Sequence, residues 1–226
     1  MKLDWMKAVI FDMDGVLIDT FEAHRKGFDV VMRRRYGFGV GREEFLGYFG
    51  MDPRDITAGL LKAHGVSEMP DFNLFYAEKQ REFRRMTEEG VIVLPGVREL
   101  LEKLRKENFR IALASSTTLK SIIPLMEKTG LKGYFQAFTG MEDTKKAKPE
   151  PEVYLKAAEK LGVPPADCWV IEDSLPGIEA GRKAGMRVVG VQTGMRSERE
   201  LLGAGADFVV KTLEELDTGD LREKVE

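Results

Sequence analysis

The stretch AVIFDMDGVLIDT, residues 8–20, contains the first strand that the sequence predicts. Its apolar run from Ala8 to Phe11 is short and continuous, which is typical of a strand buried on both faces of a parallel sheet. Asp12 follows directly, and Asp14 comes two residues later. Carboxylates this close repel each other, so the arrangement costs stability unless a cation or a reaction uses it. The pair therefore indicates a functional site at the end of this strand.

The composition describes a chain that can form more than one domain. It has 226 residues, 43% of them hydrophobic, enough for a sizeable core and a smaller second domain. The net charge of -3 gives no electrostatic case for binding nucleic acid or a membrane surface. Cys168 is the single cysteine, so an intrachain disulfide is excluded, and its apolar surroundings predict a buried, inert thiol. No apolar segment approaches the length of a membrane span, and we expect a cytoplasmic protein.

Strands and helices alternate after residue 90, whereas the segment before it is helical throughout. Apolar runs typical of buried strands occur at residues 109–115, 135–140, 168–173, 187–194 and 206–211. Amphipathic stretches between them predict helices, and the alternation predicts a doubly wound, mostly parallel α/β sheet with helices on both faces. Residues 21–90 read instead as four helices. We therefore expect a core of residues 1–20 and 91–226 with an all-helical insertion at residues 21–90.

Polar residues collect after four of the predicted strands. In chain order they are Asp12 and Asp14, Ser115 and Ser116, Lys148, and Glu172 and Asp173. The carboxyl ends of parallel strands meet at one edge of the sheet, where such folds bind ligands. We therefore expect these side chains to lie close together.

This set of side chains fits phosphoryl transfer. Asp12 and Asp173 offer the hard oxygen ligands that Mg²⁺ prefers. Lys148 and Ser115 can contact phosphoryl oxygens, and the reaction needs mainly positioning and charge neutralisation. Asp12 can act as the nucleophile and form an aspartyl-phosphate. Asp14 can then give a proton to the leaving oxygen and later take one from water.

Each motif alone also has a plainer structural interpretation. The aspartate pair could cap a turn, and the serines could cap the following helix. Lys148 could be a solvated loop lysine, and Glu172 with Asp173 could cap the helix that follows them. Their order along the chain and their shared position at strand ends favour the functional interpretation.

Four segments resemble, in order, the four motifs of the haloacid dehalogenase superfamily. They are FDMDGVLIDT (11–20), LASST (113–117), KPEPE (148–152) and IEDSLPGIEAG (171–181). The resemblance covers the whole chain and is greatest to phosphoglycolate phosphatases and β-phosphoglucomutases. It implies a Rossmann-like core with an α-helical cap at residues 21–90. The dehalogenases lack the second aspartate, so Asp14 points to phosphoryl chemistry.

The resemblance also implies a metal centre and two catalytic aspartates. It makes Asp12 the nucleophile and Asp14 the acid and base. It places Mg²⁺ on Asp12, Asp173 and the backbone carbonyl of Asp14. Glu172 is expected in or near the same coordination shell.

Contacts to the substrate are expected from both predicted domains. The resemblance implies phosphate contacts for Ser115 and Lys148, and we include Ser116 beside them. His24 matches a position where the mutases carry a histidine that assists a hydroxyl group, although a partly buried histidine at a helix start is the alternative. Arg54 and Lys79 could each face the substrate, but the sequence favours a solvated helix face for both.

The leading hypothesis is a Mg²⁺-dependent phosphatase for a small phosphomonoester, such as a sugar phosphate or phosphoglycolate. The alternative is a β-phosphoglucomutase-like phosphomutase, which His24 supports. A non-enzymatic phospho-receiver module also carries carboxylates, a hydroxyl and a lysine. However, its phosphorylated aspartate follows a middle strand of its chain and it has no cap, whereas Asp12 follows the first strand here. The expected partner is a small phosphorylated metabolite, with neither nucleic acid nor membrane, and the expected state is a monomer or small homo-oligomer.

Overall fold

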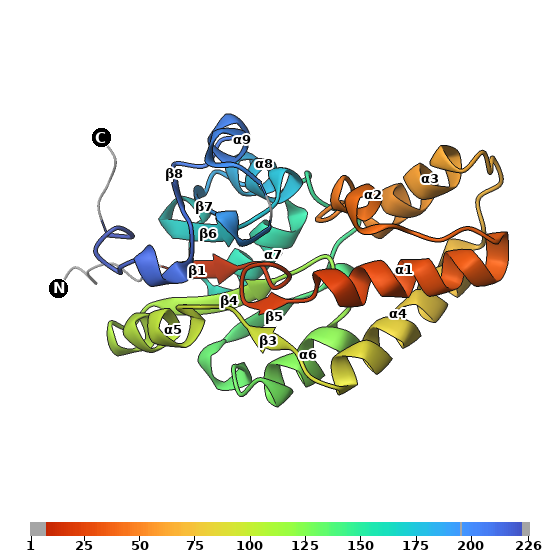
Figure 1. The fold of residues 1–226 in the computed structure, drawn as a ribbon. Helices are drawn as coiled ribbons and strands as arrows, with labels where there is room; N and C mark the ends of the chain where they lie inside the picture. Colours follow the sequence, from red (N-terminus) through yellow and green to blue (C-terminus); the bar gives the residue numbers. More distant parts are fainter. Residues whose placement is uncertain (1–7, 195, 223–226) are drawn as a thin grey trace. The chain divides into compact units, whose positions relative to one another are not determined.

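The computed structural model describes residues 8–194 and 196–222 (Figure 1). Contacts within the chain divide it into two compact units. One comprises Met1–Ile18 and Val93–Glu226, and the other comprises Asp19–Ile92. These limits lie two residues from the predicted boundaries at 20/21 and 90/91, and residues 1–7 of the predicted core lie outside the described ranges.

The first unit is built on a six-stranded parallel sheet with the order β5-β4-β1-β6-β7-β8. The strands are β1 (Ala8–Phe11), β4 (Arg110–Ala114), β5 (Ala137–Thr139), β6 (Cys168–Glu172), β7 (Arg187–Val191) and β8 (Phe208–Val210). The chain adds β4 and β5 on one side of β1 and then β6, β7 and β8 on the other. This arrangement confirms the predicted doubly wound α/β fold. It also places the end of β1 between β4 and β6 in the middle of the sheet.

Within the described residues of this unit, five α-helices accompany the sheet. They are α5 (Val97–Lys106), α6 (Leu119–Lys128), α7 (Glu152–Leu161), α8 (Leu175–Lys183) and α9 (Glu198–Gly203). Tyr154 of α7, Ile178 of α8 and Leu201 of α9 share one buried cluster with Ile10 of β1. Helices α5 and α6 lie on the opposite side of the sheet from α8 and α9 (Figure 1). Burying both faces explains why the strands read as continuous apolar runs, since each buried large apolar side chain contributes roughly 1.5–3 kcal/mol.

The second unit contains α1 (Phe21–Tyr36), α2 (Arg42–Leu46), α3 (Pro53–Ala63) and α4 (Phe72–Glu88). Helix α1 is capped at its C-terminal end by Gly37, whose φ of 80° is the left-handed conformation that glycine adopts without strain. Phe28 of α1 contacts Phe45 of α2 and Phe75 of α4, with ring centroids 5.6 and 6.1 Å apart. An aromatic core thus holds these helices together.

The sequence did not predict one pair of short strands. The short strands β2 (Ile18–Asp19) and β3 (Ile92–Val93) pair where the chain passes between the units, and two residues are too few to show a strand pattern in the sequence.

Cys168 is buried as predicted, and burial raises the pKa of its thiol to about 12. None of the helices in the described ranges has the length and hydropathy that a membrane span requires.

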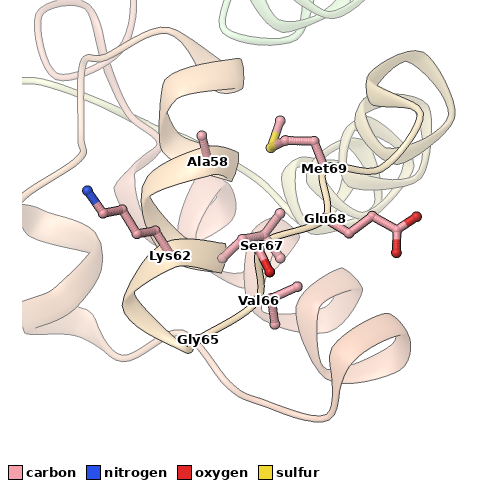
Figure 2. Close-up of a pocket in the computed structure, with 8 residues that line it drawn as sticks. Ala58, Lys62, Gly65, Val66, Ser67, Glu68 and Met69 are labelled. Carbon is pink, nitrogen blue, oxygen red and sulfur yellow. The ribbon is translucent and has the colours of Figure 1, made fainter.

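A pocket of about 440 Å³ opens in the helical unit beside α3 and the loop that follows it (Figure 2). Its lining residues are Ala58, Leu61, Lys62, Gly65, Val66, Ser67, Glu68 and Met69. None of the predicted site residues is among them, so this pocket is not the site that the sequence indicates.

Candidate active site

The turn after β1 brings the two aspartates of the first motif together. The Asp12 backbone N–H donates to the Ile171 carbonyl (3.0 Å), which extends the pairing of β1 with β6. Asp12 Oδ2 accepts a hydrogen bond from the Asp14 N–H (3.0 Å). Gly15 follows with a φ of 83°, and a Cβ atom there would lie 2.1 Å from Asp173 Oδ2. A side chain at position 15 would therefore disrupt both the turn and the carboxylate beside it.

Lys148 connects two carboxylates at the centre of the site. Its Nζ donates to Asp12 Oδ1 and to Glu172 Oε1, each at 2.6 Å, and the residue is 5% exposed. The alternative of a solvated loop lysine is therefore wrong. Burial acts to lower the pKa of Lys148, but the charges of Asp12 and Glu172 outweigh it and raise this pKa well above its usual value. The ammonium thus stays charged between its two partners.

Glu172 has both carboxylate oxygens occupied by hydrogen bonds. Besides Lys148, Oε1 accepts from the Tyr154 hydroxyl at 2.8 Å. Oε2 accepts from the backbone N–H groups of Asp173 and Ser174, both at 2.8 Å, and from Ser174 Oγ at 2.9 Å. Burial opposes ionisation, but Lys148 and these donors lower the pKa of Glu172. The arrangement suits Glu172 to holding Lys148 better than to coordinating a cation, although it was predicted as a possible ligand.

Asp173 lies beside Asp12 with an oxygen that has no hydrogen-bond donor. Within residues 8–194 and 196–222, Asp173 Oδ2 is buried and has no hydrogen-bond partner. One carboxylate oxygen from each of Asp12, Glu172 and Asp173 falls within 4.8 Å of the others. Burial and the neighbouring carboxylates raise the pKa of Asp12 to about 8, and burial with Glu172 and Asp12 raises that of Asp173 well above its usual value. An unpaired buried oxygen among carboxylates fits a hard divalent cation, which would favour the ionised forms.

Asp14 is held by hydroxyl groups that follow β4. Ser115 Oγ and Thr117 Oγ1 donate to Asp14 Oδ2 at 3.3 and 3.2 Å, and the Thr117 N–H donates to Ser115 Oγ at 3.0 Å. Ser115 therefore lies beside Asp14, while its phosphate contact stays a prediction. Ser116, the other predicted residue, is half-buried, and Thr117 provides the second hydroxyl contact to Asp14. The signal for Thr117 was present, since it ends the LASST segment.

Tyr154 is a second member of the site that sequence reasoning missed. It lies on α7 with Val153, Ala157 and Leu161, all buried, so its spacing matched an ordinary core face. Only its hydroxyl, aimed at Glu172, distinguishes it from the other core residues.

His24 and Arg54 belong to the helical unit. His24 Nδ1 lies 2.6 Å from Lys79 Nζ, and Lys79 is 1% exposed between the rings of Phe28 and Phe83. The expectation of a solvated Lys79 was therefore wrong, because the buried face of α4 includes it. Arg54 is exposed, with its guanidinium 4.1 Å from the centroid of the Phe72 ring. Substrate contacts by His24 and Arg54 stay predictions.

Comparisons with known proteins identify relatives of this chain. A family model for haloacid dehalogenase-like hydrolases matches residues 9–191. A phosphorylated carbohydrates phosphatase from Thermotoga maritima is 35% identical over 219 residues, covering 94% of this chain and 97% of that protein. A β-phosphoglucomutase from Bacillus subtilis is 34% identical, covering 98% of this chain and 96% of that protein.

Solved structures show the same architecture. The crystal structure of a β-phosphoglucomutase from Clostridium difficile has a TM-score of 0.84 and 26% identity, covering 96% of this chain and 95% of that one. The enzyme class expected from the sequence, a phosphoric monoester hydrolase, agrees with the name of the Thermotoga maritima relative and with the hydrolase family model. The chain belongs to the haloacid dehalogenase-like hydrolase family.

Proposed function

We propose that this protein is a Mg²⁺-dependent phosphatase that hydrolyses a small phosphomonoester through an aspartyl-phosphate on Asp12. The observation that carries the proposal is the Lys148 ammonium, buried at 2.6 Å from both Asp12 Oδ1 and Glu172 Oε1, beside the unpaired oxygen of Asp173. A structural ion pair does not require a further buried carboxylate without a partner. A site that binds a cation next to a phosphoryl group does require such a carboxylate, because the free oxygen serves as a ligand.

The reaction follows from the positions of the two aspartates. An Asp12 carboxylate oxygen attacks phosphorus, the bond from phosphorus to the leaving oxygen breaks, and Asp14 gives that oxygen a proton. Asp14 then takes a proton from water, whose oxygen attacks phosphorus and releases phosphate and the Asp12 carboxylate. Ser115 and Thr117, which donate to Asp14, orient it for both transfers.

Asp12 and Asp173 are the residues that would hold the cation, together with the Asp14 backbone carbonyl. When bound, Mg²⁺ neutralises charge on the carboxylates and on the phosphoryl oxygens. Lys148, which donates to Asp12 Oδ1, serves the same purpose and can hold a phosphoryl oxygen next to the nucleophile.

The substrate class is proposed from the relatives together with the charge of the chain. The Thermotoga maritima relative is named for phosphorylated carbohydrates, which favours a sugar phosphate over other phosphomonoesters. A net charge of -3 gives no reason to propose nucleic acid or a membrane surface as a partner. We propose a small phosphorylated metabolite as the ligand of a monomer or small homo-oligomer.

A phosphomutase is the second candidate. The Bacillus subtilis relative is a β-phosphoglucomutase, and the contact of His24 with the buried Lys79 gives the helical unit a polar pair that could engage a second sugar hydroxyl. Turnover that depends strictly on a sugar bisphosphate would favour this candidate over the phosphatase.

The test is hydrolysis of p-nitrophenyl phosphate and a panel of phosphorylated sugars, with Mg²⁺ and with EDTA. We expect turnover by the wild type with Mg²⁺ and a loss of about 1,000-fold or more in Asp12→Asn, because the nucleophile is removed. Asp167→Asn, a change of an exposed aspartate before β6, is the matched control and should retain activity. Stable phosphorylation without turnover would instead indicate a phospho-receiver. No turnover under any condition, bisphosphate included, would overturn the proposal.

A further inference from the structure

The Tyr154 hydroxyl is the one group on α7 that enters the network around Lys148. Tyr154 is buried, and its hydroxyl donates to Glu172 Oε1 at 2.8 Å. The same oxygen accepts from Lys148 Nζ at 2.6 Å. Lys148 Nζ also lies 4.9 Å from the centroid of the Tyr154 ring. The tyrosine therefore contacts Glu172 through its hydroxyl and borders Lys148 through its ring.

The hydrogen bonds of Glu172 explain why a hydroxyl at this position matters. Glu172 Oε1 accepts two hydrogen bonds, one from Lys148 and one from Tyr154. Oε2 is already held by three donors from residues 173 and 174. Without the hydroxyl, Oε1 would lose one of its two donors in a buried site and keep only the Lys148 ammonium. The ammonium would then be drawn toward Glu172 and away from Asp12.

We propose that Tyr154 is a positioning residue that keeps the Lys148 ammonium shared between Glu172 and the nucleophile Asp12. The inference rests on the proposed function, because it assigns Lys148 the task of holding Asp12 and a phosphoryl oxygen. Tyr154 does not touch the reacting atoms. Its hydroxyl supplies one of the two hydrogen bonds to Glu172 Oε1. The Lys148 ammonium therefore stays bonded to both Glu172 and Asp12.

The kinetic test compares Tyr154→Phe with the wild type on p-nitrophenyl phosphate. The variant keeps the buried ring and removes only the hydroxyl. We expect kcat to fall about tenfold, the size of a lost hydrogen bond to a charged group, while KM changes by less than about twofold. Mg²⁺ binding, measured by calorimetry without substrate, should be unchanged, because Glu172 is not proposed as a ligand.

Tyr134→Phe is the matched control. Tyr134 also donates its hydroxyl to a glutamate, Glu102, away from the site, and this variant should match the wild type. Equal kcat values for Tyr154→Phe and the wild type would overturn the proposal. So would tighter Mg²⁺ binding by Tyr154→Phe, since that would show the freed oxygen of Glu172 acting as a ligand.

A second measurement does not depend on turnover. In protein labelled with ¹⁵N-lysine, the buried Lys148 ammonium is identified by the signal that disappears in Lys148→Met. We expect this signal to shift in Tyr154→Phe and not in Tyr134→Phe. An unshifted signal would overturn the positioning role even if the protein is an active phosphatase. A shifted signal in a protein without phosphatase activity would retain that role and refute only the proposed function.

Discussion

At the residue scale, the buried carboxylate of Asp173 lowers the stability of the fold. Its Oδ2 is buried and unpaired within the described ranges, and its neighbours include the carboxylates of Asp12 and Glu172. A buried polar atom without a partner costs about 1–3 kcal/mol, more when it is charged. A fold alone would not favour such an atom, so the cost points to a ligand that offsets it.

Replacing Asp173 by Asn should therefore stabilise the protein when no cation is present. In EDTA at pH 8 we expect a gain of about 1–2 kcal/mol in the free energy of unfolding, because the buried repulsion is removed. Added Mg²⁺ should raise the melting temperature of the wild type and of Asp167→Asn but not of Asp173→Asn. An Mg²⁺ response in Asp173→Asn equal to that of the wild type would refute the metal assignment.

The raised pKa of Asp12 predicts a pH dependence of stability. Burial moves this pKa from 3.8 to about 8, with Glu172 and Asp14 adding to the shift and Lys148 opposing it. Between these pH values the folded protein holds a proton that the unfolded chain has lost, so this contribution to stability is lost as pH rises toward 8. The raised pKa of Asp173 acts in the same direction.

We expect chemical denaturation in EDTA to show the free energy of unfolding of the wild type falling, relative to Asp12→Asn, from pH 5 to pH 8. The lowered pKa of Glu172 changes stability mainly below pH 5, and the raised pKa of Lys148 changes it mainly above pH 8. Saturating Mg²⁺ should remove the difference in slope, because the cation favours ionised Asp12. Parallel curves for the two proteins in EDTA would contradict the raised pKa.

Helix α8 illustrates the element scale, because its first turn closely approaches the site. Ser174 caps the helix by accepting from the Gly177 N–H at 3.2 Å. A Cβ atom at Gly177 would lie 1.7 Å from Glu172 Oε1. The glycine is therefore required by the close approach of Glu172, and the helix start and the Lys148 network constrain each other.

Gly177→Ala should displace the Glu172 carboxylate and disturb Lys148. We expect the free energy of unfolding to fall by about 1–3 kcal/mol from overpacking, and kcat on p-nitrophenyl phosphate to fall about tenfold or more. Gly203→Ala in α9 is the matched control, since a Cβ atom there has nothing within 4 Å, and it should be neutral or slightly stabilising. Equal activity of the two variants would show that Glu172 tolerates displacement.

The whole molecule combines an α/β unit that carries the proposed chemistry with a helical unit that carries His24 and Arg54. The reacting groups proposed above all come from the first unit. If the helical unit supplies specificity, its residues should affect the binding of the leaving group rather than the chemical step.

Arg54→Ala should then raise KM for a phosphorylated sugar by about tenfold with little change in kcat, while KM for p-nitrophenyl phosphate stays the same. Arg42→Ala is the matched control, because Arg42 also lies over a phenylalanine ring, 4.8 Å from the centroid of Phe21. Equal effects of Arg54→Ala on both substrates, or none on either, would remove Arg54 from the substrate site.

The sequence by itself determined the order of strands and helices, the helical insertion and most of the proposed site. Apolar runs and periodic faces are local properties of the chain, so they identify β1, β5 and β6 without knowledge of their neighbours. The topology of a parallel sheet then brings the residues after those strands to one edge, which is why Asp12, Lys148 and Asp173 could be grouped in advance.

Tertiary packing alone decided the contacts of Tyr154, Thr117, Lys79 and Glu172. Tyr154 and Lys79 lie on helices whose spacing is equally typical of a plain core face or a solvated face, and only their neighbours show a hydroxyl aimed at Glu172 and an ammonium between aromatic rings. Thr117 and Glu172 are identified only by hydrogen bonds to residues that are distant in the chain. Thr117 donates to Asp14, and Glu172 accepts from Lys148. Such partners depend on which surfaces meet after folding, and residue spacing does not encode this information.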